Sequence, residues 1–395
     1  MQQSYLIDAI RTPRGRLSRP KNNFTGELAN IHPVTLGGLL VNAMMDRNPN
    51  LPTDKIEDLI YATTIAVREQ AHNIARYIVL DSKLPSSVSG IHVNRYCSGS
   101  LQANAFANAS VMAGDYDVVL AGGGEHLNMV QMGSDRSDPE HLPLTDGIRA
   151  KYDIVHQGLS AEIIAEKYGL SQEEINDFSV RSHQLAYAAT EAGKFKNEII
   201  PIAYTDSEGI ERVLDTDTSI KLDTRVEVMS GLPRPFKEGG MIHAAAASGI
   251  CDGASLALWA SETMVKAYDL KPRAKILANA NFGVNPKEMM DGVIPGTELA
   301  LKRAGLTIDD IDRFEVNEAF ACVPLAWMKT LKVPERKVNV NGGAIALGHP
   351  LGATGGILLA TMINELEREN LHYGLITLCA NLGLSGTMII ERLGT

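Results

Sequence analysis

Position 97 holds a cysteine in a setting that can make a thiol nucleophilic. Residues 94–102 read Asn-Arg-Tyr-Cys-Ser-Gly-Ser-Leu-Gln, after a strand-like run at Ile91 and Val93 and before a helix-permitting run over 101–112. A strand, a tight turn and a helix would place the sulfur over the N-terminus of the helix. The free N–H groups and the dipole there stabilise a thiolate and lower its pKa, as a nucleophilic cysteine requires. The alternative is an inert buried cysteine, which is the commoner state of a free thiol.

Composition indicates a globular protein of several domains and excludes some functions. The chain has 395 residues, which predicts two or three domains, with 45% hydrophobic and 21% charged residues. Its net charge is −10 and it has no basic run, so nucleic acid is not an expected partner. No apolar run approaches the roughly 20 residues that span a bilayer. The chain opens on a predicted strand, 5–10, and not on a signal peptide.

The cysteine pattern argues against a metal site and against a disulfide framework. The four cysteines contain no CxxC pair and lie far apart, at Cys97, Cys251, Cys322 and Cys379. Spacing of this kind predicts a reducing compartment, and we expect a cytoplasmic protein without a metal.

The elements that must position Cys97 follow from hydrophobic periodicity. Strands are predicted over 5–10, 59–61 and 116–121, and helices over 33–45, 73–80 and after Cys97. The glycine triplet 122–124 lacks the G-x-G-x-x-G spacing of a phosphate loop and is interpreted as a turn. The arginine-rich loop 11–16 is either solvated or an anchor for neighbouring carboxylates.

An internal repeat predicts that the fold is duplicated. Segment 53–60 resembles 308–315 at an offset of 255 residues, and segment 115–120 resembles 372–377 at an offset of 257. The turn at 348–352 then corresponds to the Cys97 turn, and the two helix N-termini are expected to meet at one cleft. The polar stretch from about 121 to 249, with helices over 160–168 and 173–192, looks like an insertion between the two copies.

Several motifs in a fixed order give the chain a resemblance to a known family. They are Cys97 in N-x-x-C-S-G-S, Asn317-Glu318-Ala319-Phe320, the long block 341–355 around His349, and a late Cys379. In this order they resemble the thiolase family of acyl-CoA C-acyltransferases over essentially the whole chain. Segment 156–162 in the insertion is similar to the family's His-x-Gly-x-x-Ala-Glu.

The resemblance implies an α/β fold of two duplicated βαβαβαββ-type halves in α/β/α/β/α layers with an inserted loop domain. It places an N-terminal region at 1–270, with the CoA-binding insertion at about 121–249, and a C-terminal domain at 271–395. It implies cleavage of a 3-ketoacyl-CoA by CoA, or the reverse Claisen condensation. CoA and acyl-CoA would be substrates, no cofactor would be tightly bound, and the chain would form a homodimer or a dimer of dimers.

The resemblance also assigns roles to individual residues. Cys97 would carry the acyl group, His349 would be the base, and Cys379 would handle the proton at the substrate's α-carbon. One oxyanion site would consist of His349 and a water held by Asn317, and the other of the backbone N–H groups of Cys97 and Asn381. For CoA, the expected contacts are Ser248, Ala319, Phe320 and His156, with Lys221 or Arg225 at the phosphates.

Three departures from the family pattern affect the substrate. Residues 243–249 read His-Ala-Ala-Ala-Ala-Ser-Gly where the family usually has Thr-Ala-Gly-Asn-Ala-Ser-Gly, Asn381 replaces a glycine, and Gln157 replaces a methionine. They favour a degradative thiolase for fatty acids or steroid rings over an acetoacetyl-CoA synthase. A ketoacyl synthase is disfavoured, because that class has a histidine where this chain has Asn317. The other alternative is a catalytically impaired protein that only binds acyl-CoA or lipid.

Overall fold

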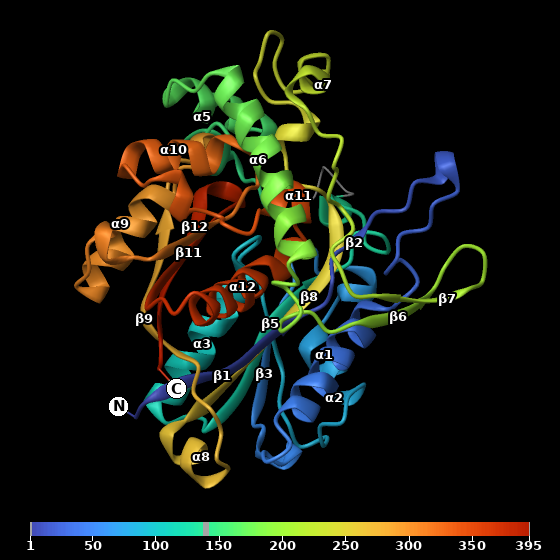
Figure 1. Cartoon of the computed structure of the whole chain (residues 1–395), viewed down its shortest axis with the longest axis vertical. Coiled ribbons are helices and arrows are strands. Elements are labelled where there is room, and N and C mark those ends of the chain that lie inside the picture. Colours follow the sequence, from blue (N-terminus) through green and yellow to red (C-terminus); the bar gives the residue numbers. More distant parts are fainter. Residues whose placement is uncertain (1, 137–141, 395) are drawn as a thin grey trace.

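The chain folds into two similar α/β halves with an inserted segment packed across them. A computed structural model describes residues 2–136 and 142–394, and Figure 1 shows their arrangement. One mixed sheet runs through both halves in the order β10-β11-β12-β9-β1-β8-β5-β3-β4, with β2 paired to β8.

The amino-terminal half supplies one end of this sheet. Its strands are β1 (Ser4–Arg11), β2 (Gly15–Arg16), β3 (Asp58–Ala62), β4 (Ile91–Val93), β5 (Val118–Glu125) and β8 (Cys251–Ser261). β3 runs parallel to β4 and β5, whereas β8 is antiparallel to β5 and β1. The carboxyl ends of β3 and β5 therefore meet at one edge of the sheet.

The carboxy-terminal half repeats this order. Its strands are β9 (Ala274–Gly283), β10 (Arg313–Val316), β11 (Tyr373–Ala380) and β12 (Leu384–Arg392). β10 and β11 are parallel, and β12 is antiparallel to β11 and β9. The halves join where Leu6 of β1 pairs with Ala274 of β9.

The predicted duplication is confirmed element by element. β3 and β10 begin 255 residues apart, and so do β5 and β11. The offset of 257 predicted for segments 115–120 and 372–377 is therefore two residues too long. The helices α3 (Gly99–Ala113) and α12 (Thr354–Arg368) show the same offset. α3, which follows Cys97, is therefore the counterpart of α12, which follows the His349 turn.

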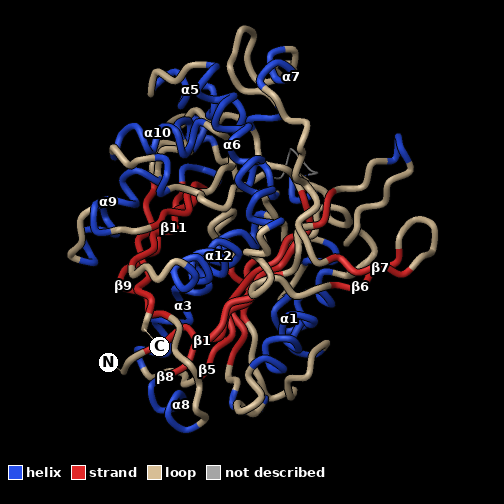
Figure 2. Tube along the Cα trace, viewed as in Figure 1, coloured by secondary structure: helices blue, strands red, loops and turns tan. Residues whose placement is uncertain are grey.

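α3 and α12 form the central layer between the two groups of strands (Figure 2). Their apolar side chains share one core with strands of both halves, including Leu101, Leu359 and Met388. Close packing begins at their N-termini, where a side chain on Gly355 would lie 2.4 Å from the backbone nitrogen of Leu101. There, Gly356 N–H also donates to Ser100 Oγ at 2.9 Å.

The other helices form outer layers or belong to the insertion. α1 (Pro33–Arg47) and α2 (Ile74–Leu80) cover the amino-terminal strands, and α9 (Val293–Ala304) and α10 (Cys322–Leu331) cover the carboxy-terminal ones. The remaining helices are α4 (Asp146–Arg149), α5 (Gln157–Lys167), α6 (Gln172–Glu191), α7 (Val226–Ser230), α8 (Glu262–Ala267) and α11 (Ala344–Leu347).

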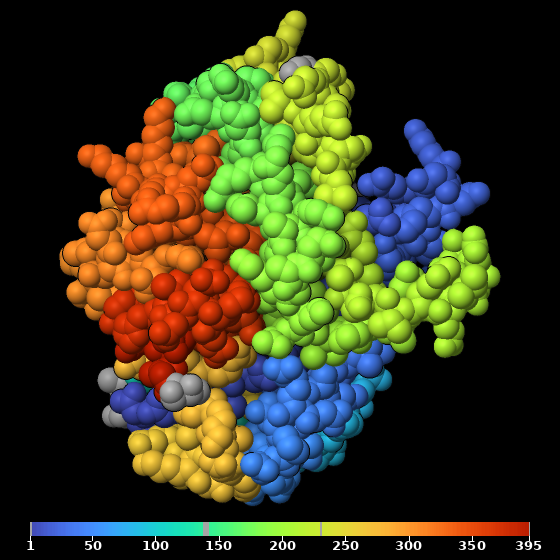
Figure 3. Space-filling model, in the orientation of Figure 1, coloured from blue at the N-terminus to red at the C-terminus, as the bar shows by residue number. Residues whose placement is uncertain are grey.

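The insertion consists of α4 to α7 and the hairpin of β6 (Ile202–Thr205) and β7 (Glu211–Leu214). The predicted capping box is present, because Ser171 and Glu174 bond each other's backbone N–H at the start of α6. Figure 3 shows this green segment lying against the orange and red carboxy-terminal half. The domain boundary predicted at 270/271 falls between α8 and β9.

The prediction that residues 122–124 form a turn is wrong, because they belong to β5. A side chain on Gly122 would lie 2.0 Å from the Ser255 carbonyl oxygen, and one on Gly123 would lie 2.4 Å from that of Gly352. Glycine is therefore required for close backbone packing at the end of this strand, which delivers Glu125 to the interior.

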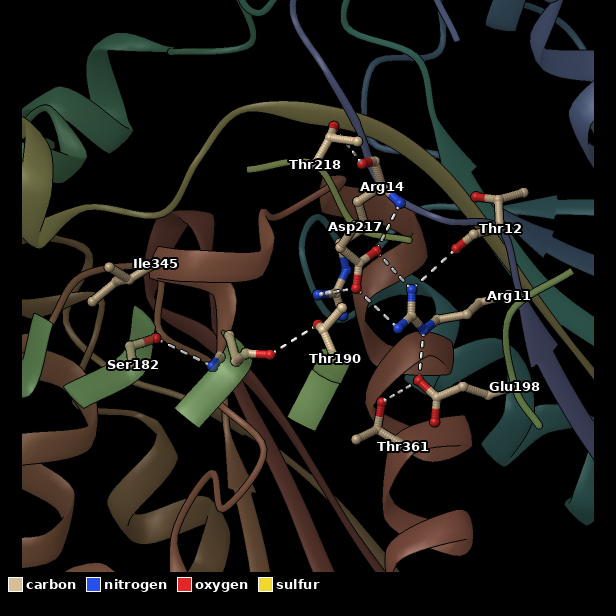
Figure 4. Close-up of polar contacts among 12 residues, drawn as sticks. Arg11, Thr12, Arg14, Ser182, Thr190, Glu198, Asp217, Thr218, Ile345 and Thr361 are labelled. Atoms are coloured by element: carbon tan, nitrogen blue, oxygen red, sulfur yellow. Dashed lines mark hydrogen bonds and ion pairs between the residues drawn. The ribbon is translucent and has the colours of Figure 1, made fainter. Parts of the chain in front are cut away.

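The loop 11–16 is an anchor for carboxylates, which was one of the two alternatives predicted from the sequence. Arg11 is fully buried, and its guanidinium bonds Glu198 at 2.7 Å and Asp217 at 2.8 Å (Figure 4). Thr361 of α12 donates to the same Glu198 carboxylate at 2.9 Å. This ion cluster joins β1 to the insertion and to α12.

Candidate active site

The Cys97 turn has the predicted strand–turn–helix form. β4 ends at Val93, Tyr96 adopts a left-handed φ of 48°, and α3 begins at Gly99. Cys97 is buried. Burial raises the pKa of its thiol, and the charges of Cys379 and Glu125 add to the effect. The expected lowering of the pKa by the helix N-terminus is therefore outweighed, because desolvation disfavours the thiolate.

Cys379 approaches Cys97 from the other half of the chain. It lies near the carboxyl end of β11, and burial raises the pKa of its thiol to about 12. A charge on Cys379 raises the pKa of Cys97, so the two thiols are electrostatic neighbours. Residues 282 positions apart in the sequence therefore interact electrostatically in the folded chain.

His349 lies in the turn that precedes α12, and its ring is buried. Its backbone N–H donates to the Gly249 carbonyl at 2.8 Å, and its Nδ1 lies 2.7 Å from Thr354 Oγ1. Burial and the nearby Arg14 cation lower the pKa of His349 to about 3. The imidazole is therefore neutral at pH 7, with one ring nitrogen free of a proton.

Asn317 follows β10 and lies beside His349. Its backbone N–H donates to the Thr377 carbonyl of β11 at 3.0 Å, and its Nδ2 is 3.5 Å from His349 Nε2. Its buried Oδ1 has no hydrogen-bond partner among the described residues. Because β10 and β11 are parallel neighbours, Asn317 and Cys379 emerge at the same sheet edge.

Four of the residues expected to contact CoA lie in one patch. Ser248 N–H donates to the Ala319 carbonyl at 3.0 Å, and the residue before Ser248 forms a bridge with Phe320. The Phe236 ring stacks on His156 at 5.4 Å between centroids and meets Phe320 edge-on at 6.2 Å. Sequence reasoning missed Phe236, whose proline-rich surroundings gave no periodic signal.

Lys221 and Arg225 lie in the segment between β7 and α7, and both are exposed. The Lys221 backbone N–H donates to His183 Nδ1 at 3.1 Å, and Arg225 precedes the first residue of α7. Within the described residues, no hydrogen bond, ion pair or ring contact joins either side chain to the Phe236 patch.

Asn381, which stands where the family has a glycine, is not among the residues with a left-handed backbone. The left-handed residues after Cys379 are Leu382, at φ 58°, and Gly383, at φ 80°. Asn381 Oδ1 accepts the Leu382 N–H at 3.0 Å and so stabilises the turn from within. The side chain of Asn381 therefore has a structural role in the loop that follows Cys379.

Glu125 is a buried residue of the site that sequence reasoning did not single out. Its carboxylate accepts backbone N–H groups from Thr64 and Ile65 and from Gly352, close to His349. The signal that could have identified Glu125 was an acidic residue directly after the glycine triplet of a buried strand. Within the described residues, no group of three or more His, Cys, Asp or Glu is arranged to hold a metal, and no helix is long and apolar enough to cross a membrane.

The duplicated α/β fold and its thiol–imidazole site define a class of acyl-transferring enzymes. Models of the "Thiolase, N-terminal domain" and the "Thiolase, C-terminal domain" match residues 4–263 and 270–392. The chain belongs to the thiolase family and is an acyltransferase that acts on acyl-CoA.

Similar proteins cover the whole chain. A steroid 3-ketoacyl-CoA thiolase of Mycobacterium tuberculosis is 42% identical over 401 residues, with 100% of this chain and 95% of that protein covered. A 3-ketoacyl-CoA thiolase of Serratia proteamaculans is 39% identical, with 99% and 100% covered. The crystal structure of an acetyl-CoA acetyltransferase from Bacillus anthracis has a TM-score of 0.88 at 32% identity, with 100% and 99% covered.

Proposed function

We propose that this chain cleaves 3-ketoacyl-CoA substrates with CoA through an acyl group carried on Cys97. Two pairs support the proposal: Cys97 interacts electrostatically with Cys379, and Asn317 contacts His349. Glu125, whose charge acts on Cys97, accepts the Gly352 N–H of the His349 turn and so relates the two pairs. Two thiols serve the reaction because it contains two proton transfers, one at sulfur and one at carbon.

In the first half-reaction, His349 Nε2 takes the proton of the Cys97 thiol. The thiolate attacks the C3 carbonyl carbon, and the bond between C2 and C3 breaks. Its electron pair passes to the departing acetyl-CoA enolate, which takes the proton of Cys379 at C2. Acetyl-CoA leaves, and the shortened acyl group stays on Cys97 as a thioester.

In the second half-reaction, the Cys379 thiolate takes the proton of incoming CoA. The CoA sulfur attacks the acyl-Cys97 thioester, the bond to Cys97 breaks, and acyl-CoA forms. The Cys97 thiolate then recovers its proton from His349. One 3-ketoacyl-CoA and one CoA thus give acetyl-CoA and a shortened acyl-CoA, with both thiols restored.

We assign the oxyanion contacts to residues of the same site. Once protonated at Nε2, His349 can donate to a carbonyl oxygen, and Asn317, with its unpartnered Oδ1, can hold the expected water beside it. Backbone N–H groups at Cys97 and Asn381 are proposed for the second oxyanion site. Each such donor is worth about 10²–10³ in rate.

The substrate is proposed to be a 3-ketoacyl-CoA with an acyl group bulkier than acetoacetyl, from fatty-acid or steroid-ring degradation. The 42% identity to a steroid 3-ketoacyl-CoA thiolase and the departures at 243–247 and Gln157 support this choice. The patch at Ser248, Ala319, Phe320 and His156 is proposed to hold the pantetheine arm, with Lys221 or Arg225 at the phosphates. We also propose a homodimer or a dimer of dimers in a reducing compartment such as the cytoplasm, which fits four free cysteines.

Mass spectrometry after incubation with acetyl-CoA tests the proposed function. We expect one acetyl adduct on the Cys97 peptide, removed by added CoA and absent in Cys97→Ala. A panel of 3-ketoacyl-CoA thioesters should give its highest kcat/KM with bulky acyl groups. A wild-type chain that binds CoA but never acylates would instead support the binding-protein alternative.

A further inference from the structure

Glu125 occupies a closed cage of hydrogen-bond donors at the end of β5. Its side chain is 1% exposed. Oε2 accepts N–H groups from Thr64 and Gly352, each at 2.9 Å, and Oε1 accepts from Ile65 at 3.2 Å and Gln70 Nε2 at 3.0 Å. The donors come from three separate segments, so one carboxylate joins them.

One side of this cage leads to the Cys97 turn. Thr64 donates its N–H to Glu125, and its carbonyl accepts a hydrogen bond from Asn94 Nδ2 at 2.8 Å. Asn94 Oδ1 in turn accepts the N–H of Tyr96 at 2.9 Å, where the backbone is left-handed. Because Tyr96 directly precedes Cys97, the contacts from Glu125 fix the backbone that presents the thiol.

The other side of the cage leads to the His349 turn. Gly352 lies three residues after His349 and two before the start of α12. A side chain on Gly352 would lie 2.9 Å from the Gly124 carbonyl oxygen and 3.0 Å from Thr63 Cα, so the two backbones are in direct contact. Glu125 therefore holds the His349 turn at a fixed distance from the segment that supports Cys97.

The cage requires a carboxylate. Both oxygens face N–H donors, so a proton on either oxygen, or the amide NH₂ of a glutamine, would meet a donor instead of an acceptor. Burial raises the pKa of Glu125, and the four donated hydrogen bonds oppose that effect. Burial is the largest cause of the raised pKa of Cys97, and the charges of Cys379 and Glu125 raise it further.

We propose that Glu125 is the positioning residue that locks the His349 turn of one half to the Cys97 turn of the other. This inference rests on the proposed function of those two residues. Misplacing reacting groups by about 1 Å costs about 10²-fold in rate, so a side chain that only sets this distance can control turnover.

The test compares Glu125→Gln and Glu125→Asp with a matched control, Glu162→Gln. Glutamine removes the charge, whereas aspartate keeps the charge but shortens the reach. Glu162 is also 1% exposed and accepts two backbone N–H groups, from Met241 and Ile242 at 2.8 Å each. It lies in the insertion and is therefore a matched buried carboxylate outside the Glu125 cage. The readouts are kcat and KM for thiolysis, melting temperature, and the pH midpoint of Cys97 alkylation by iodoacetamide.

We expect kcat to fall about 10²-fold in both Glu125 variants, with KM within about twofold of wild type. The alkylation midpoint should fall by about one pH unit in Glu125→Gln and stay unchanged in Glu125→Asp and Glu162→Gln, because only the first removes the charge near Cys97. If Glu125→Gln does not fold, Glu125→Asp alone decides through kcat.

A kcat within about threefold of wild type in either Glu125 variant would overturn the proposal. So would an equal fall of the alkylation midpoint in Glu162→Gln, because the effect would then come from general loosening. If wild type shows no thiolysis at all, the proposed function fails, whereas the alkylation comparison still tests the link between Glu125 and Cys97.

Discussion

The amide nitrogen of Asn317 lies 3.5 Å from Nε2 of His349, although 32 residues separate the two in sequence. The opposite ring nitrogen, Nδ1, is 2.7 Å from Thr354 Oγ1. Thr354 has a single hydroxyl proton and donates it to the Pro350 carbonyl at 3.1 Å, so Oγ1 accepts from Nδ1–H. Nε2 then carries the lone pair, which is the tautomer that can accept the Cys97 proton.

Thr354→Val should therefore slow acylation of Cys97 by about 10- to 100-fold, because valine keeps the shape but removes the acceptor that selects the tautomer. The measurement is the rate of acetyl adduct formation from acetyl-CoA by mass spectrometry. Thr361→Val on the same helix removes a hydroxyl that bonds Glu198 and is the control. Equal rates in wild type and Thr354→Val would show that this hydroxyl does not select the tautomer.

Cys379→Ser should separate the two proton transfers. Cys97 should still acylate, because His349 serves that step, whereas thiolysis and condensation should fall by about 10²–10⁴-fold, since a serine hydroxyl is a much weaker acid than a thiol. Adduct formation and steady-state thiolysis measured on one preparation check this. Loss of acylation together with thiolysis would contradict the division of roles.

Buried histidines should make the fold sensitive to acid. Burial lowers the pKa of His243 to about 4, with the Arg234 cation adding to the effect, and His243 Nε2 bonds Asn176 Oδ1 at 2.8 Å. Between pH 6.5 and 4 the unfolded chain binds the proton that the folded chain excludes, so stability falls as pH falls. Burial also lowers the pKa of His183 and of His349, so these two histidines change stability with pH in the same direction.

His243→Gln removes one of these groups but can keep the bond to Asn176. Its melting temperature should decline less steeply than that of wild type between pH 7 and 4. Thermal unfolding at several pH values measures the slope. An unchanged slope would mean that His243 protonates freely in the folded protein.

Arg11→Met should reduce the free energy of unfolding by about 3 kcal/mol or more. It leaves Glu198 and Asp217 buried without their main cation, and such uncompensated charges are costly. Lys266→Met breaks an exposed pair with Glu262 on α8 and should leave the free energy of unfolding nearly unchanged, because solvent screens such pairs. Chemical denaturation of both variants measures the difference, and similar losses would show that burial does not set the cost.

Several elements could be predicted from local pattern alone. The strand at β1, the helix from Pro33 and the capping box at Ser171 follow from periodicity and capping chemistry. The prediction of a turn at the glycine triplet in β5 was wrong. Its glycines are required by close contact with a carbonyl on another strand and with one in the His349 turn, and not by a local turn. Phe236 was missed for the same reason, since its partners His156 and Phe320 are distant in sequence.

The amino-acid sequence by itself determined the duplicated halves, the turns that bear Cys97 and His349, and the membership of the thiolase family. Periodicity and each motif depend on residues close to one another along the chain, and the repeat and the motif order can be read by comparing such segments in one dimension. Only the tertiary structure decided the state of the groups, such as the raised pKa of Cys97, the tautomer of His349 and the cage around Glu125. Burial and long-range hydrogen bonds set these properties, and both exist only after distant segments have packed together.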